Sequence, residues 1–421
     1  MTTDTLAPPH TRFTAGWAAK RAHAFKEEYR EVFERIAETA IERERERRLP
    51  FEEVEALREA GFTRVTLPVE LGGGGASVVE LFELLTHLAQ HDSNLAQIFR
   101  SHFAHLERQV LAPPSERRDA ALRRIADGAI FGNASHERSS AQVGSLSTRV
   151  VRDDSGYRLD GVKYYSTGTL FADWVSVSAL DEDGAFVGVP VGTTSSGVTR
   201  VDDWTGFGQR LTGSGTTTFE GVRIREEDLV RRDGRGPGHG GAFVQLVLLA
   251  ALAGIGRAVV SDATHFIASR TRAYSHGSAT TAAADPIVQE TIGELSALSY
   301  QADAALASAV ELVQESHDLQ LHGDGSDAAV DAASEAAIAA DDATAHAQLV
   351  VIGAVLDATT RLFDVGGASA TDSARAFDRH WRNARTIASH NPHRYKARAI
   401  GDLLLNDIPL SNSWQTGEAS E

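Results

Sequence analysis

The sequence predicts a mostly α-helical protein with a central β domain. Apolar residues recur at helical spacing near both ends of the chain, and their spacing falls toward two in the middle. With 421 residues, of which 42% are hydrophobic, the chain exceeds what one hydrophobic core usually serves. We therefore expect an N-terminal helical domain over residues 1–128, a middle β domain over 129–235 and a C-terminal helical bundle over 236–421.

The N-terminal part has the pattern of amphipathic helices. Gly16 to Arg48 carries apolar residues such as Tyr29 and Phe33 at helical spacing. Pro50 then opens a second helix, which Gly61 closes. Further helices are predicted over Ser77 to Leu111 and over Arg118 to Ala126. The Gly-rich segment Leu67 to Gly75 lacks the Lys-Ser or Lys-Thr of a nucleotide P-loop, so it predicts a tight chain reversal.

The middle part has the alternation of β-strands. Thr148–Arg152 and Tyr157–Asp160 are joined by the turn sequence Asp-Asp-Ser-Gly, which predicts a hairpin. Trp174–Ala179 and Ala185–Pro190 flank Glu-Asp-Gly and predict a second hairpin. Thr216–Ile224 gives one more strand.

The C-terminal part is predicted to form long Ala-rich helices that pack closely, over Ala242–Tyr274, Asp285–His317 and Asp327–Phe363. A polar loop, His322 to Gly325, separates the last two. The longest apolar run, Ala242 to Ile255, contains Gln245 and is too short to span a bilayer, so we expect a buried helix.

Composition excludes some classes of function. A net charge of -17 disfavours nucleic acid or an anionic membrane surface as a partner. The absence of cysteine excludes disulfides, thiolate catalysis and Cys-ligated metals, and fits a reducing cytoplasm. The N-terminal residues lack the pattern of a signal peptide, so we expect a cytoplasmic protein.

The segment Phe377 to Asp402 concentrates Arg, Lys, His, Asn and Trp on what is otherwise a helical pattern. Pro392 follows His390 closely, which places His390 at a helix end or in a turn, where an imidazole can serve chemistry. The alternative is that His380 and His390 are hydrogen-bonded core or surface residues. His102 and His105 share a helical face as metal ligands would, but no further ligand completes a cluster, so no metal is expected.

Two segments of the β domain predict a ligand pocket. Gly132 to Ser135 and Tyr164 to Gly168 place small hydroxyl or amide side chains beside glycine or alanine at strand ends, where a flat polar ligand can approach the backbone. Trp204 lies near Gly206 and Gly208 and can stack on the same ligand.

The order of these motifs resembles the acyl-CoA dehydrogenase superfamily over essentially the whole chain. The motifs are LPVELGGGG, GNASHE, KYYSTG, FGQRLTGSGTTTFEGVRI, LFDVGGASA and HWRNARTIASHNP. The resemblance implies an N-terminal helical domain, a β barrel and a C-terminal four-helix bundle, assembled as a homotetramer with flavin at a subunit interface. GNAS, DDW, FDRxWRNxRT and the run from His390 to Lys396 are most similar to the flavin-dependent monooxygenase branch.

That resemblance also implies roles for individual residues. The predicted catalytic residues are His390, Thr167, Asn133 and His102. Thr167 would meet flavin N5, and a histidine matching His390 faces flavin C4a in the sulfur monooxygenases. The predicted cofactor-binding residues are Asn133, Ser135, Thr167, Trp204, Arg272, Gly366 and Gly367, with Arg270 as the alternative to Arg272 for the flavin phosphate. Ser101 and Gln97 replace an aromatic and histidine pair of that branch, and His102 matches a neighbouring histidine.

The function implied is a two-component monooxygenase that uses reduced FMN and O2, through a C4a-hydroperoxyflavin, on a small apolar, sulfur-containing substrate. An amine or an aromatic carbon is the alternative oxygenated group. A separate reductase is expected because the chain has no Rossmann fingerprint. The outer wall of the substrate pocket is expected from Leu95–His105 and Tyr274–Asp285, whose small side chains indicate a substrate with few charges.

Two alternatives stay open from the sequence. The first is an FAD-dependent acyl-CoA dehydrogenase, although residues 382–395 contain no carboxylate to act as its base. The second is a flavin-binding protein without catalysis.

Overall fold

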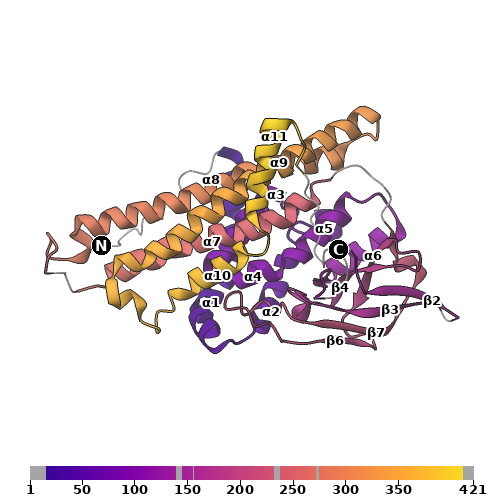
Figure 1. Ribbon diagram of the computed structural model, residues 1–421, viewed down its shortest axis with the longest axis horizontal. Coiled ribbons are helices and arrows are strands. Elements are labelled where there is room, and N and C mark those ends of the chain that lie inside the picture. Colours follow the sequence, from indigo (N-terminus) through magenta and orange to yellow (C-terminus); the bar gives the residue numbers. More distant parts are fainter. Residues whose placement is uncertain (1–15, 139–144, 155, 232–237, 272–274, 411–421) are drawn as a thin grey trace.

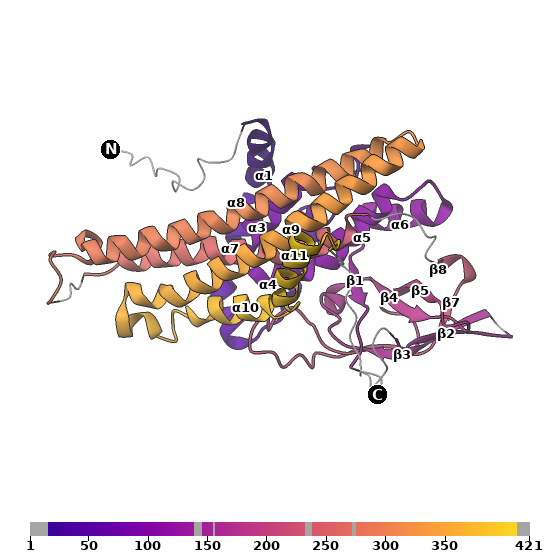
Figure 2. The same ribbon diagram turned by 45° about the horizontal axis from the view of Figure 1, so that its top comes forward.

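The computed structural model shows a helical protein with a central sheet (Figure 1). It describes residues 16–138, 145–154, 156–231, 238–271 and 275–410. The sheet lies at one end of the molecule, and the long C-terminal helices extend away from it toward the other end (Figures 1 and 2). The N-terminal helices pack between the two, chiefly through α3 against α7.

The predicted N-terminal helices are present, with one subdivision. Asp92 caps the helix that follows it, and Phe99 ends that helix, so the predicted helix from Ser77 to Leu111 is three helices. A capping box between Ser77 and Glu80 opens the first of them. The elements are α1 (Gly16–Glu46), α2 (Phe51–Glu59), α3 (Val78–His91), α4 (Ser93–Ile98), α5 (Arg100–Leu111) and α6 (Glu116–Ala126), with short 3-10 helices at Phe62–Arg64 and Val69–Leu71.

The Gly-rich segment is the tight reversal that the sequence predicts. The backbone N–H of Gly73 donates to the carbonyl of Pro68 over 3.1 Å, and that of Gly75 donates to Leu67 over 3.0 Å. A Cβ on Gly73 would lie 2.0 Å from the Leu67 carbonyl oxygen, so no larger residue fits this turn.

The sheet contains both predicted hairpins. β2 (Arg149–Asp153) pairs antiparallel with β3 (Gly156–Lys163), and β4 (Trp174–Leu180) pairs antiparallel with β5 (Phe186–Gly192). The predicted strand near Thr216 is β7 (Thr217–Ile224). Three short strands were not predicted: β1 (Phe131–Ala134), β6 (Val198–Arg200) and β8 (Val230–Arg231).

The strand order is β6-β7-β3-β2-β4-β5-β8, and β1 pairs parallel with β4. Within the described residues this path is open between β6 and β8, so the barrel implied by the resemblance is here an open sheet in its hydrogen bonding. Ala134, Val177, Val189 and Phe219 contribute to its own hydrophobic core.

The C-terminal part consists of long packed helices. They are α7 (Gly240–Ala268), α8 (Pro286–His322), α9 (Asp327–Arg361), α10 (Asp378–Ala388) and α11 (His393–Asn406), with 3-10 turns at Ala282–Ala284, Leu362–Val365 and Gly367–Thr371. Helix α7 is long and apolar enough to cross a membrane, but 83% of its most apolar window is buried inside the protein, as the sequence predicts for a core helix. Phe33 and Phe62 of the N-terminal part share one core with Leu249 and Val355 of the bundle.

The predicted domain boundary at 128/129 falls between α6 and β1. The boundary at 235/236 lies outside the described residues.

Candidate functional site

The two predicted ligand segments of the β domain lie side by side. The N–H of Asn133 donates to Thr169 Oγ1 over 3.1 Å, and Thr169 Oγ1 donates to the Asn133 carbonyl over 2.9 Å. Ser135 Oγ donates to Asn133 Oδ1 over 2.7 Å, which holds the amide in place. The structure therefore brings Asn133 and Ser135 of one segment next to the turn that contains Thr167.

Thr167 presents a hydrogen-bond acceptor. Its N–H donates to the Tyr165 carbonyl over 2.8 Å, so the backbone amide is occupied. Thr212 Oγ1 donates its only proton to the Gln209 carbonyl over 2.9 Å. Ser214 must then donate to Thr212 over 2.7 Å, and Thr167 must donate to Ser214 over 2.7 Å. The lone pairs of Thr167 Oγ1 are left for an N–H donor.

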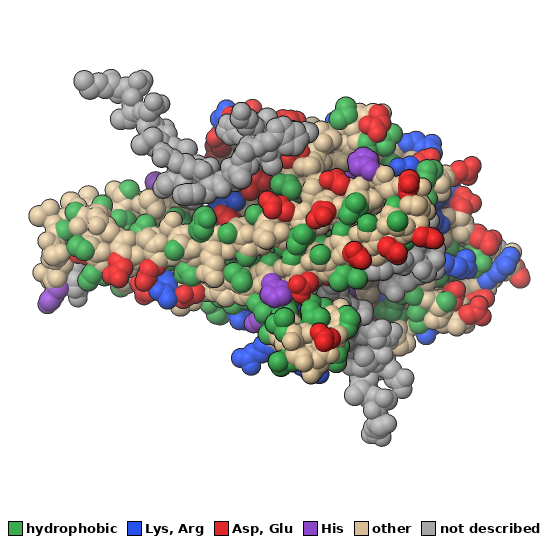
Figure 3. Space-filling view, turned by 90° about the horizontal axis from the view of Figure 1, so that it is seen from above, with side chains coloured by type: hydrophobic (Ala, Val, Ile, Leu, Met, Phe, Trp, Pro, Cys, Tyr) green, Lys and Arg blue, Asp and Glu red, His purple; other side chains and the backbone are tan. Residues whose placement is uncertain are grey.

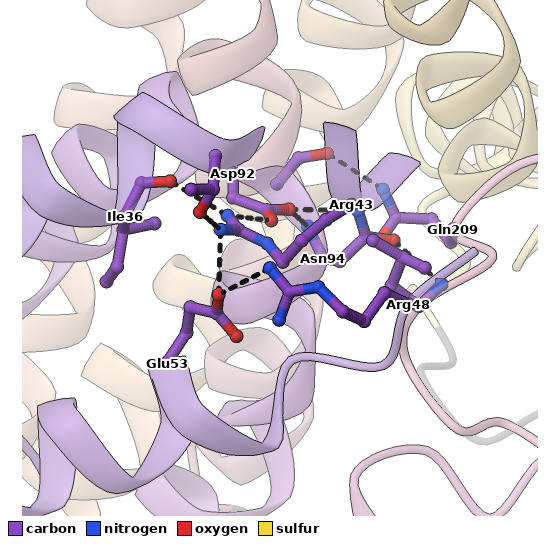
Figure 4. Close-up of polar contacts among 10 residues, drawn as sticks. Ile36, Arg43, Arg48, Glu53, Asp92, Asn94 and Gln209 are labelled. Carbon is purple, nitrogen blue, oxygen red and sulfur yellow. Dashed lines mark hydrogen bonds and ion pairs between the residues drawn. The ribbon is translucent and has the colours of Figure 1, made fainter. Parts of the chain in front are cut away.

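A buried polar network holds the segment that carries this hydroxyl chain (Figure 4). Arg43 is fully buried and donates to Glu53 and to Asp92, each over 2.9 Å. Asp92 in turn accepts from the Asn94 side chain over 2.9 Å, and Asn94 Oδ1 accepts from the N–H of Leu211 over 3.3 Å. The N-terminal helices thus fix the residues directly before Thr212 and Ser214.

Helix α10 also contacts the segment before Thr212, at residues 207–209. Asn383 Oδ1 accepts from the N–H of Gln209 over 2.6 Å, and Trp381 stacks on Phe207 with 5.9 Å between ring centroids. A Cβ on Gly208 would lie 2.0 Å from the Arg382 carbonyl oxygen, so the close approach requires glycine. His380 is buried and bonds to Asp262 over 2.8 Å, which gives it a structural role.

His390 lies in the bend after α10, as predicted, and contacts a residue that sequence analysis missed. Arg100 Nη1 lies 3.0 Å from His390 Nε2. Because a guanidinium only donates, Nε2 is the acceptor, and the ring proton is on Nδ1, 3.3 Å from Asn391 Oδ1. The Asn391 amide donates to Gln245 Oε1 over 2.6 Å. Burial and then the charge of Arg100 lower the pKa of His390 to about 3, so the imidazole is neutral.

His102 lies in the framework of the fold. It is fully buried, with Nε2 bonded to the Thr63 carbonyl and Nδ1 accepting from the N–H of Phe131 over 3.3 Å. Both ring nitrogens are thus used, which leaves none for a substrate and argues against the predicted catalytic role. His105 stacks on Phe131 with 3.9 Å between ring centroids.

Trp204 lies beside the tyrosines of the second segment. Its indole N–H donates to the Gly208 carbonyl over 3.3 Å, and its ring meets Tyr165 edge-on with 6.1 Å between centroids. A Cβ on Gly206 would lie 2.2 Å from the indole, so the backbone covers part of one ring face.

The remaining predicted cofactor residues lie elsewhere. Gly366 and Gly367 follow α9 at the end of the bundle away from the sheet (Figures 1 and 2). There a Cβ on Gly366 would lie 2.2 Å from the Phe266 ring, and Arg270 lies over the same ring at 5.4 Å. Arg272 lies outside the described residues. One chain therefore does not bring Gly366 and Gly367 to Thr167.

The donor and acceptor set near Thr167 fits a flavin. Ser166 Oγ is buried without a hydrogen-bond partner among the described residues, and Thr167 Oγ1 offers an acceptor to an N–H. Buried polar atoms are rarely left unpaired, and a flavin bound here would give Ser166 Oγ its partner. An isoalloxazine supplies the N–H and carbonyl groups that such atoms bind.

Comparisons with known proteins identify the family of the chain. The model of the acyl-CoA dehydrogenase N-terminal domain matches residues 20–129, and that of the C-terminal domain matches residues 246–395. The chain is 31% identical to dibenzothiophene monooxygenase of Mycolicibacterium goodii, covering 90% of this chain and 92% of the relative. It is 30% identical to "Probable FMNH2-dependent monooxygenase SfnC" of Pseudomonas putida, covering 90% of this chain and 94% of the relative. The structure of methanesulfinate monooxygenase MsuC from Pseudomonas fluorescens superposes with a TM-score of 0.82 at 28% identity, covering 92% and 98%.

Proposed function

Because the chain belongs to the acyl-CoA dehydrogenase family, in its branch of FMN-dependent monooxygenases, we propose that it is the oxygenase of a two-component system that oxygenates sulfur compounds. The observation that carries this proposal is the state of His390. A dehydrogenase needs a base to remove a proton from its substrate. His390, with its pKa lowered to about 3 and a guanidinium on Nε2, is a poor base, and residues 382–395 contain no carboxylate.

Reduced FMN, when bound, supplies the activated oxygen atom that passes to the substrate sulfur. The residues of this chain hold and shield it. Thr167 Oγ1 would accept from a flavin N–H, Ser166 Oγ and the Asn133 amide would bond the ring edge, and Trp204 would close one side. The exclusion of water that follows limits loss of the activated oxygen as hydrogen peroxide.

A separate NAD(P)H-dependent flavin reductase supplies the reduced FMN in this proposal, since the chain has no Rossmann fingerprint. A cytoplasmic location, where such reductases meet their partners, fits a chain without cysteine. The names of two relatives contain different sulfur compounds, an uncharged thiophene and a sulfinate anion. Family membership therefore does not fix the substrate, and we propose that residues particular to this chain select it.

We also propose that the active enzyme is a homotetramer in which two chains build each flavin site. Thr167 follows strand β3 of the sheet, whereas Gly366 and Gly367 lie in the turns after α9, which ends at the far end of the bundle. Arg270 lies over Phe266, the ring that Gly366 approaches. A second copy can bring its far end to the first chain's Thr167. Hydrophobic side chains are spread along the bundle face in Figure 3. Exposed apolar residues of α8, α9 and α11 suited to that contact include Ile287, Tyr300, Ile338, Leu404 and Leu405.

Complementation tests the shared site. We expect Gly367→Trp and Thr167→Val to be defective separately, each with its defect in a different half of the site. Co-assembled oligomers that contain both should recover part of the activity, because some sites then combine two unaltered halves. A monomer by light scattering that is fully active, or no recovery in verified mixed oligomers, would contradict the shared site.

The function itself is tested by aerobic turnover with FMN, NADH, a flavin reductase and a panel of sulfides, thiophenes and sulfinates, with products identified by mass spectrometry. We expect oxygenated sulfur products that require the reductase. The acyl-CoA dehydrogenase alternative predicts instead rapid reduction of an artificial acceptor by a saturated acyl-CoA. A protein that binds flavin and gives neither product would have the non-catalytic role.

A further inference from the structure

Arg100 is a buried cation without an anionic partner. The residue is 9% exposed, and its guanidinium donates to His390 Nε2 over 3.0 Å. No carboxylate of the described residues lies within ion-pair distance of its guanidinium. Arg43, which is also buried, has both Glu53 and Asp92 at 2.9 Å. The fold therefore pairs a buried arginine with carboxylates where the role is structural, and it does not do so at Arg100.

The surroundings of Arg100 are neutral or positive. His390 is held neutral, and burial followed by the charges of Arg100 and Lys163 lowers the pKa of His136. Lys163 itself is neutralised by Glu137 over 2.6 Å. Burial lowers the pKa of Arg100 only to about 10, so its guanidinium stays charged at neutral pH. A buried charge is costly unless it is paired, and the group missing here is an anion.

We propose that Arg100 binds an oxyanion of the substrate, and that the substrate class is therefore organic sulfinates. The planar fork of an arginine matches two oxygens of one anionic group, and the free N–H groups of Arg100 are available for that pairing. Arg100 belongs to the helix expected to line the substrate pocket, and it adds a buried positive charge to that wall. This assignment rests on the monooxygenase function proposed above.

Among sulfides, thiophenes, sulfinates and sulfonates, only sulfinates meet two chemical requirements of the proposed site. Oxygen transfer needs a lone pair on sulfur, which sulfides, thiophenes and sulfinates have and sulfonates lack. Pairing with Arg100 needs a negative charge at neutral pH, which sulfides and thiophenes lack. The reaction balances as RSO2⁻ + O2 + FMNH2 → RSO3⁻ + FMN + H2O. FMNH2 and sulfur each give two electrons to O2, one oxygen atom forms the new S–O bond, and the other leaves as water.

The chain from Gln245 through Asn391 to His390 positions Arg100. Gln245 orients the Asn391 amide, and Asn391 Oδ1 accepts a hydrogen bond from His390 Nδ1–H. His390 Nε2 is thereby kept as an acceptor for one arm of the guanidinium. The neutral tautomer leaves the positive charge of Arg100 uncompensated for the substrate.

The test compares benzenesulfinate with methyl phenyl sulfide, which are similar in size and differ in charge. We expect the wild type to prefer the sulfinate. Arg100→Met should lower kcat/KM for the sulfinate by about 10²-fold, mainly through KM, and change it less than a few-fold for the sulfide. Arg100→Lys should be intermediate, because a point charge replaces the fork. Arg108→Met, an exposed arginine on the same helix, is the matched control and should leave both substrates unaffected.

Anaerobic titrations give a readout besides turnover. Benzenesulfinate should bind the FMN-loaded wild type and bind Arg100→Met about 10²-fold more weakly, with FMN affinity unchanged. Weaker FMN binding by Arg100→Met, or equal losses with sulfinate and sulfide, would overturn the inference and assign Arg100 to the flavin or the fold. A wild type that oxygenates the sulfide and rejects sulfinates would also overturn it and leave the monooxygenase function standing. Oxygenation of neither compound nor of any sulfur compound would instead refute the proposed function.

Discussion

Arg100 Nη1 donates to His390 Nε2 across 3.0 Å and so joins residues 290 positions apart in the chain. This contact changes the role predicted for His390. An imidazole that accepts on Nε2 and has its proton on Nδ1, toward Asn391, has no proton to give at Nε2. His390 therefore acts as a positioning residue for Arg100, and its role as a proton donor to an oxygen intermediate is not supported by this geometry.

The first prediction concerns pH. With its pKa lowered to about 3, His390 is neutral throughout the range in which the enzyme is stable, so its titration should leave no mark on kcat/KM between pH 5 and 8. Only below about pH 3 would His390 be protonated, and the imidazolium would then lose its contact with Arg100. The measurement is a pH profile of the wild type and of His390→Asn. An acid limb near pH 6.5 that only the wild type shows would return His390 to acid–base chemistry.

The second prediction concerns the loss of His390. His390→Ala removes the acceptor that fixes one arm of Arg100. The kcat/KM for the sulfinate should therefore fall by about 10²-fold, because the substrate is misplaced. FMN binding should stay unchanged, because none of the contacts to Thr167 involve His390. Exposed His346 on α9 provides the control, since His346→Ala should retain wild-type kinetics. Wild-type kinetics in His390→Ala would show that Arg100 is held without it.

The third prediction separates Thr167 from its support. Thr167→Val removes the only acceptor that the hydroxyl chain directs at a flavin N–H, so the ratio of hydrogen peroxide to oxygenated product should rise several-fold. Ser214→Ala keeps the Thr167 oxygen as an acceptor and should raise the ratio less. Peroxide and product are both quantified in the same reaction. An equal rise in the two variants would mean that the orientation of the chain, rather than the Thr167 oxygen, controls the outcome.

The fourth prediction concerns the network around Arg43. Arg43→Met leaves buried Glu53 and Asp92 without their cation, which should destabilise the fold by about 3–5 kcal/mol in urea unfolding. Arg30→Met, on the same helix but 56% exposed beside Glu27, should leave the free energy of unfolding close to that of the wild type. Similar losses of unfolding free energy in both variants would contradict the claim that burial makes the Arg43 ion pairs important for stability.

The fifth prediction uses the two histidines, His239 and His317, that flank buried Glu107. One carboxylate oxygen lies 2.8 Å from His239 and 2.7 Å from His317. Burial raises the pKa of Glu107, but the bonds from the histidines outweigh it and lower that pKa to about 2. Burial lowers the pKa of His317, but the bond from Glu107 outweighs it and raises that pKa.

The stabilisation by Glu107 is present above its ordinary pKa of 4.5 and is lost as the pH falls toward 2. The stabilisation by His317 is present below its ordinary pKa of 6.5 and is lost as the pH rises through its raised value. The free-energy difference between wild type and Glu107→Gln should therefore be largest between these two ordinary pKa values, while exposed Glu315→Gln shows no such maximum. A flat difference from pH 4 to 8 would refute the coupling.

The same three groups could hold a metal ion by their positions, since the ligand atoms lie within 4.8 Å of one another. The N···O distances of 2.7 and 2.8 Å are those of hydrogen bonds, whereas two ligands of a tetrahedral zinc lie about 3.3 Å apart. A chelator should accordingly leave the unfolding transition unchanged.

The three-part fold was predictable because hydrophobic spacing records which face of each element is buried. Both hairpins and the Gly73 turn followed from local signals. β1 was missed because four residues, Phe131 to Ala134, are too few to show alternation, and β6 and β8 are shorter still.

The site was predictable only in part, because its key contacts are between distant residues. Asn133 contacts Thr169, next to the turn that contains Thr167, as expected for two segments of one pocket, but the roles of Asn133 and Thr167 toward flavin remain predictions. Arg100 gave no signal, since a basic residue inside an amphipathic helix is common and only the fold shows that it is buried against His390. His102 was assigned to catalysis because sequence cannot show that the backbone at Thr63 and Phe131 uses both of its nitrogens.

Isotope incorporation is the most direct test of the monooxygenase function. Wild-type enzyme, FMN, NADH and a flavin reductase are mixed with benzenesulfinate or methyl phenyl sulfide under ¹⁸O2, and the sulfur product is weighed by mass spectrometry. A monooxygenase inserts one ¹⁸O atom from ¹⁸O2 into each product molecule. In the control with unlabelled O2 and ¹⁸O-labelled water, the product should carry no inserted ¹⁸O. Product without label from O2, or α,β-desaturation of an acyl-CoA without oxygen incorporation, would contradict the account.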